Sequence, residues 1–188
     1  ALTNKEGILY DVVGVGNALV DVIAMVDDGF LGDNDMIKGS MALIETDRAV
    51  ELTGRLSDTV RTSGGSGANT LAGIASLGGD VAFIGKVSDD ELGRVFADDM
   101  AAIGVDFRSG GAAAGIPTGR CIIAVTPDAQ RTMNTYLGVS TLLSFDDLDD
   151  RILAAGAVLY LEGYLFDRDE AKEAFRRASA IAHANGRV

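Results

Sequence analysis

Short apolar runs alternate along the chain with amphipathic segments, and this alternation predicts a parallel sheet covered by helices. The expected strands are short, rich in branched side chains and bounded by glycine or charged residues: residues 9–15, 81–84 and 158–161. The expected helices repeat apolar positions at helical spacing: residues 46–56, 68–77, 88–103, 145–155 and 169–184. Ser88 and Glu91 have the spacing of a capping box at the start of one of them. The chain is therefore expected to have an α/β fold.

Two further regions contain strand and turn signals only. Residues 20–26 and 36–44 are short apolar stretches separated by aspartate and glycine. Residues 105–137 include a hairpin, with Pro127 and Asp128 in its turn. These regions predict a second, smaller β-sheet inserted into the first, with strands drawn from about residues 20–45 and 105–138.

Composition narrows the class of protein. The 188 residues carry 16 Lys and Arg against 28 Asp and Glu, a formal charge of −12, which disfavours binding to nucleic acid. The sequence has one cysteine, Cys121, and one histidine, His183. We therefore expect no disulfide within the chain, no metal site and a reducing, cytoplasmic setting. No apolar run is long enough to predict a membrane span, and no signal peptide is recognised.

Polar residues follow two of the expected strands. In open α/β sheets ligands bind beyond the carboxyl ends of the strands, which makes Asn17, Asp21, Glu162 and Tyr164 candidates. A carboxylate such as Asp21 can accept hydrogen bonds from both hydroxyls of a diol. The alternative is that Asp21 and Asn17 only close a turn, since both residue types are common in turns.

A glycine-rich segment, residues 64–69 (GGSGAN), precedes a predicted helix. Glycine allows the backbone to approach a ligand closely, and the helix start offers free N–H groups. The alternative interpretation is a flexible loop that only starts the helix. The candidate ligand-binding residues here are Gly64, Gly65, Ser66 and Asn69.

Two familiar nucleotide motifs are absent, and one arginine is a further candidate. A dinucleotide fingerprint beginning at Gly14 would need glycine where Leu19 stands, and Gly85-Lys86 lacks the rest of a phosphate-binding loop. Arg131 falls in the predicted hairpin, where it could pair with a phosphate or could simply be a surface residue.

Three segments together resemble the ribokinase-like (PfkB) family of carbohydrate and nucleoside kinases: residues 14–21 (GVGNALVD), 64–69 (GGSGAN) and 84–93 (IGKVSDDELG). Within the family, residues 16–21 and 131–138 (RTMNTYLG) look more like the adenosine kinase branch than like ribokinase. The resemblance extends over nearly the whole chain. It implies a ribokinase-like parallel sheet flanked by helices, with the smaller β-sheet acting as a lid.

The resemblance also implies an activity and roles for residues. The expected reaction is phosphoryl transfer from ATP, with Mg²⁺, to a primary hydroxyl of a nucleoside or sugar. By similarity, Asp21, Gly65 and Asn69 would hold the ribose hydroxyls, and Arg131 would stabilise phosphate charge. The remaining predicted substrate-binding residues are Asn17, Leu19, Gly64, Ser66, Glu162 and Tyr164.

The family's C-terminal signature, Asp-Thr-x-Gly-Ala-Gly-Asp, does not occur in this sequence. That signature supplies the catalytic base and most of the ATP site in the family, so residues 1–188 are expected to be the N-terminal part of one kinase domain, holding the substrate pocket and lid. The alternatives are a ribokinase- or fructokinase-type sugar kinase and a non-catalytic sugar- or nucleoside-binding protein. A homodimer through the open edges of the lid is also predicted.

Overall fold

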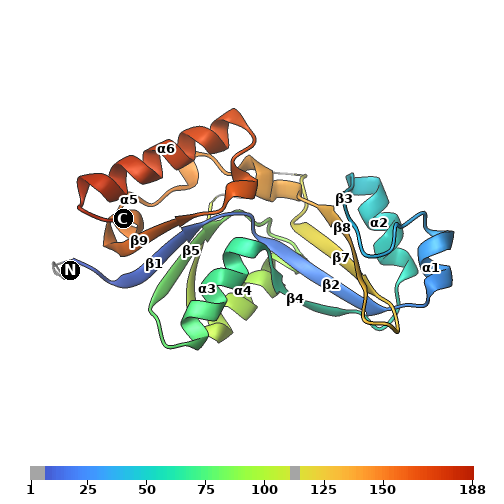
Figure 1. Ribbon diagram of the computed structural model, residues 1–188. Coiled ribbons are helices and arrows are strands. Elements are labelled where there is room, and N and C mark those ends of the chain that lie inside the picture. The colour runs from blue at the N-terminus through green and yellow to red at the C-terminus, as the bar shows by residue number, and fades with distance from the viewer. Residues whose placement is uncertain (1–6, 111–114) are drawn as a thin grey trace.

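The computed structural model describes residues 7–110 and 115–188, and Figure 1 shows two β-sheets joined end to end. The first sheet has four parallel strands in the order β6-β5-β1-β9. Its strands are β1 (Tyr10–Val15), β5 (Val81–Gly85), β6 (Val105–Ser109) and β9 (Gly156–Leu161). The predicted parallel sheet flanked by helices is confirmed.

Helices cover both faces of this sheet (Figure 1). One face carries α3 (Ser66–Ser76) and α4 (Glu91–Ile103), and the other carries α5 (Asp150–Ala155) and α6 (Asp169–Ala184). Consecutive β5 residues alternate between them: Phe83 packs with Leu71 of α3, whereas Ile84 packs with Phe175 of α6. Burial on both faces explains why these strands are almost continuously apolar.

The second sheet has five strands in the order β3-β8-β7-β2-β4 and mixed pairing. Its strands are β2 (Leu19–Met25), β3 (Met41–Leu43), β4 (Val60–Gly64), β7 (Gly119–Val125) and β8 (Arg131–Tyr136). Two helices, α1 (Asp28–Asp33) and α2 (Thr46–Arg55), pack against Ile122, Ala124 and Tyr136. On the face of this sheet that α1 and α2 do not cover, side chains of β7 and β8 such as Cys121 and Met133 line a cavity.

The 3-10 helices η1 (Gly138–Leu142) and η2 (Phe145–Asp147) lead from β8 of the second sheet to α5, whereas η3 (Gly163–Leu165) lies between β9 and α6. Within the described residues, no helix combines the length and the apolar character that crossing a membrane requires.

Several local predictions were wrong. The capping box at Ser88 does not form, because α4 begins at Glu91 and the Asp90 side chain accepts a hydrogen bond from the Gly93 N–H at 2.8 Å. The aspartate- and glycine-containing segment between the two expected strands forms α1, a helix that was not expected, and Asp27 caps it by accepting a hydrogen bond from the Phe30 N–H. Strand β4 was not expected, and β6 joins the large sheet rather than the small one.

Candidate functional site

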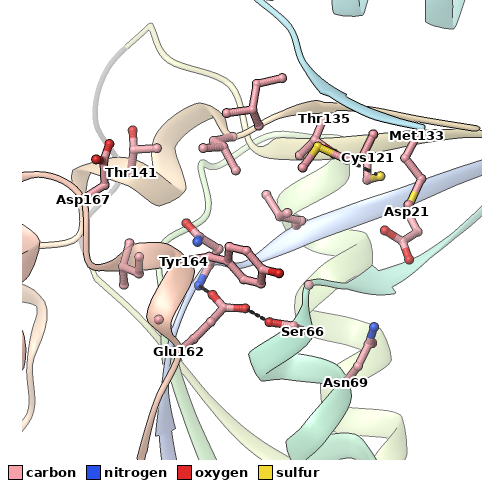
Figure 2. A pocket seen from close by; sticks show the side chains of 18 of the residues that line it. Asp21, Ser66, Asn69, Cys121, Met133, Thr135, Thr141, Glu162, Tyr164 and Asp167 are labelled. Carbon is pink, nitrogen blue, oxygen red and sulfur yellow. Dashed lines mark hydrogen bonds between the residues drawn. The ribbon is translucent and has the colours of Figure 1, made fainter. Parts of the chain in front are cut away.

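A cavity of about 690 Å³ lies where the two sheets meet. Its floor is formed by the end of β1, the start of α3 and the end of β9, and one wall by the uncovered face of the five-stranded sheet. This position is the carboxyl edge of the parallel strands, where α/β proteins bind ligands. Figure 2 shows several of the lining side chains, among them Asp21, Asn69, Glu162 and Tyr164.

Asp21 presents a free carboxylate to the cavity. It lies on β2 opposite Cys121, and no described residue donates a hydrogen bond to its oxygens. Burial raises its pKa to about 6, and the nearby Arg131 lowers it by a smaller amount. A partly buried carboxylate with no partner is costly, so the group is prepared to accept hydrogen bonds from a ligand.

Two glycines allow the segment before α3 to pack against β1 and β2. A Cβ on Gly64 would overlap the Asp21 carboxylate, so a side chain there would displace it. Gly65 has φ +94°, and a Cβ there would lie 2.7 Å from the Asn17 carbonyl oxygen. These contacts require glycine at both positions. They place the exposed first turn of α3, with Ser66 and Asn69, beside the cavity.

Glu162 joins three segments of the floor. Its side chain is buried and accepts hydrogen bonds from the backbone N–H of Asn17 at 2.6 Å and of Gly67 at 2.8 Å. The Ser66 hydroxyl donates a further, short hydrogen bond to the same carboxylate (Figure 2). The charge also suits the N-terminal end of α3. Glu162 therefore holds the end of β1 and the glycine segment together at the end of β9.

Two further lining residues are basic and aromatic. Arg131 begins β8 and is exposed, and Tyr164 of η3 has 78% of its surface exposed. Neither side chain has a hydrogen-bond partner among the described residues, so both are free to meet a ligand.

The cavity brings together the residues that the sequence singled out, although their roles stay predictions. Gly64 alone does not line it, because it lies behind the Asp21 carboxylate. The predicted residues that do line it are Asn17, Leu19, Asp21, Gly65, Ser66, Asn69, Arg131, Glu162 and Tyr164.

Sequence reasoning missed the apolar wall of the cavity. Alternate residues of β7 and β8 point into it: Cys121, Ile123, Met133 and Thr135. The two-residue period of these strands was the signal that could have found them. The Cys121 thiol accepts a 3.3 Å hydrogen bond from the Thr135 hydroxyl, and burial raises its pKa, which disfavours the reactive thiolate form.

Asp147 is a buried carboxylate outside the cavity lining. It forms an ion pair with Lys86, with an Nζ–Oδ1 distance of 2.6 Å, and both side chains are almost fully buried. A Cβ on Gly110 would overlap the Asp147 side chain. The pair therefore fixes the end of β5 to η2.

The donor groups of the cavity fit a hydroxylated ligand better than a metal ion. Residues 7–110 and 115–188 contain no cluster of three histidine, cysteine or carboxylate side chains that could bind a metal. Arg131 and Arg168 are lining residues whose charge suits a phosphate.

Comparison with known proteins gives the family. Residues 35–188 match the model of the pfkB family of carbohydrate kinases, which is most of the chain, and the chain belongs to this family. The structure resembles an adenosine kinase from Sinorhizobium meliloti, with a TM-score of 0.85 and 51% identity over 95% of the chain. It also resembles a probable sugar kinase from Rhizobium etli CFN 42, with a TM-score of 0.85 and 44% identity over 95% of the chain.

Among curated proteins, fructokinase-1 of Oryza sativa subsp. japonica is 32% identical over 131 residues, or 68% of this chain. The chain spans 40% of that relative and 54% of each of the two solved structures. The relatives are therefore substantially longer than the 188 residues described by this sequence.

Proposed function

We propose that these residues form the acceptor-substrate half of a kinase that transfers phosphate from ATP to a hydroxyl group of a nucleoside or sugar. The observation that carries this proposal is the partnerless Asp21 carboxylate, which faces a cavity at the carboxyl edge of the parallel sheet. Such a carboxylate can orient a diol, and family membership supports phosphoryl transfer as the chemistry.

Each side of the cavity has a part in this proposal. Asp21, Gly65 and Asn69 bind the ring hydroxyls, and Glu162 keeps the glycine segment in place beneath them. Arg131 begins a strand of the five-stranded sheet and stabilises charge on the transferred phosphate. The sheet acts as a lid that excludes water from the reacting groups.

A nucleoside is favoured over a simple sugar as the substrate. The wall formed by Cys121, Ile123 and Met133 is apolar, and a cavity of about 690 Å³ has room for a flat base beside a sugar ring. The 51% identity to an adenosine kinase supports the same choice. A fructokinase-type activity is the second candidate, supported by the rice relative.

ATP and Mg²⁺ are the co-substrates that the family implies. The described residues offer Arg131 to the phosphates but no cluster of metal ligands, so we assign no step through the metal to this chain. We propose that the catalytic base and most of the ATP site belong to a further segment of the full-length protein, as the length of the relatives suggests. The cytoplasmic setting and the dimer through the lid remain predictions from the sequence.

The proposal is tested on the full-length protein with a coupled ATP assay against adenosine, ribose and fructose. Turnover of adenosine, lost in Asp21→Asn, is the expected result. Asp47→Asn is the control, because that exposed carboxylate lies on α2, away from the cavity. Turnover of fructose alone would favour the second candidate. Ligand binding without any ATP consumption would identify a non-catalytic binding protein.

A further inference from the structure

The Asn17 side chain makes a buried contact that the proposed function does not use. Asn17 is 3% exposed and Ser140 is fully buried, and the Ser140 hydroxyl oxygen lies 2.9 Å from the Asn17 Oδ1 position. The two residues are 123 positions apart and come from the end of β1 and from η1. The contact therefore joins the floor of the cavity to the connection that leaves the lid.

The Ser140 hydroxyl has a second neighbour. Its oxygen lies 2.6 Å from the Leu137 carbonyl oxygen, which can only accept a hydrogen bond. Two oxygens at this distance need a proton between them, and the hydroxyl has a single proton to give. Ser140 therefore donates to Leu137 and has only lone pairs to offer to Asn17.

This assignment of the proton fixes the orientation of the Asn17 amide. The oxygen and nitrogen ends of an amide have nearly the same shape, so the hydrogen-bond network decides which end faces which neighbour. With Oδ1 at this position, two acceptors would compete for the one Ser140 proton, so the network is satisfied only when the two ends of the Asn17 amide are exchanged. Nδ2 then faces Ser140 and donates to it. The carbonyl end of Asn17 then faces the other way.

Among residues 7–110 and 115–188, no group hydrogen-bonds that other end of the Asn17 amide, and it is not a fully enclosed polar atom. Asn17 lines the cavity, which leaves this end for a ligand. We propose that Ser140 is a positioning residue that turns the Asn17 carbonyl oxygen toward the substrate, so that the pocket selects a ligand with an O–H or N–H donor at this point. The ligand-binding part of this inference rests on the proposed function.

Neighbouring groups strengthen the same preference. The Ser66 hydroxyl gives its proton to Glu162, so it too can only accept from a ligand. Asp21 offers a carboxylate. The cavity thus presents acceptors at three points, which suits a ligand rich in hydroxyl groups.

The amide orientation is tested first on the ligand-free, full-length protein by NMR. The side-chain NH₂ signals of Asn17 are identified by their loss in Asn17→Ala. We expect nuclear Overhauser effects between these protons and the Ser140 β-protons, and exchange with solvent that becomes about tenfold faster in Ser140→Ala, as loss of one hydrogen bond predicts. Absence of the Overhauser effects, with exchange unchanged in the variant, would overturn the inference.

The effect on the ligand is tested by titration calorimetry with adenosine, ribose and fructose. For the ligand that the wild-type protein binds, Ser140→Ala should weaken binding about tenfold, but should have no further effect in an Asn17→Ala background. Ser76→Ala is the control, because Ser76 makes the same hydroxyl-to-carbonyl bond, to Gly73 at 2.7 Å, without a second contact.

Equal losses from Ser140→Ala in both backgrounds would show a merely structural role and overturn the inference. If the wild-type protein binds none of the three ligands, the proposed function is contradicted, while the NMR result still decides the orientation of the amide.

Discussion

The carboxylate of Glu162 accepts a 2.6 Å hydrogen bond from the backbone N–H of Asn17, a residue 145 positions earlier in the chain. The same carboxylate holds the Gly67 N–H and the Ser66 hydroxyl. A single side chain thus sets the relative positions of two segments that line the cavity. Four predictions follow from this arrangement and from its surroundings, in addition to the experiments above.

Glu162→Gln is expected to destabilise the protein by about 1–3 kcal/mol, because an amide offers one acceptor oxygen where three donors converge. The free energy of unfolding, measured with urea, gives the test. Glu173→Gln on the exposed face of α6 is the control and should change stability by less than about 0.5 kcal/mol. A Glu162→Gln protein as stable as wild type would show that the three hydrogen bonds contribute little.

Gly64→Ala should weaken ligand binding by about tenfold or more, since the new methyl group would overlap the Asp21 carboxylate and move it. Gly73→Ala is the matched control. It lies within α3, its added Cβ would meet nothing within 4 Å, and it should raise stability by about 0.5–1 kcal/mol. Calorimetric titration and thermal unfolding of both variants give the comparison, and unchanged affinity in Gly64→Ala would remove Asp21 from the binding site.

The pKa of about 6 at Asp21 predicts opposite effects of pH on binding and on stability. Ligand affinity should be constant above pH 6 and fall by up to about tenfold per pH unit below it, because the protonated acid is a poorer acceptor. The folded state binds this proton more tightly than the unfolded state, whose pKa is near 3.8, so the contribution of Asp21 to stability should increase as pH falls through 6.

Both effects should disappear in Asp21→Asn, which carries no titrating group at this position. The test is to measure ligand affinity and the free energy of unfolding from about pH 5 to about pH 8, a range that includes the Asp21 pKa of about 6. The same pH dependence in Asp21→Asn and in wild type would assign it to another group.

Asp147→Ala should destabilise the protein by about 3–5 kcal/mol, because it leaves the buried Lys86 ammonium without its partner. The exposed pair Arg94–Asp89 is the control, and Asp89→Ala should cost less than about 1 kcal/mol. Lys86→Met combined with Asp147→Leu should recover much of the loss. Urea unfolding of the single and double variants tests this, and a small effect of Asp147→Ala would show that the pair is hydrated in solution.

The sequence by itself determined the repeating units of the fold and the candidate segments. Apolar runs of strand length and helices of regular period are local properties, so β1, β5 and α6 could be predicted from them. The glycine segment before α3 and the acidic residue at Asp21 were visible for the same reason. Their neighbourhood followed from the rule that parallel strands end at one edge of the sheet.

Only the tertiary structure decided how individual polar side chains are used. The sequence marks Glu162 as a candidate ligand-binding residue and gives Asp147 no role, yet both side chains are buried and bind partners 61 to 145 positions away. The cap of α4 moved from Ser88 to Asp90, and that aspartate also holds Thr118. Hydrogen bonds and ion pairs act over a few ångströms in space, and the separation along the chain does not encode which groups will meet.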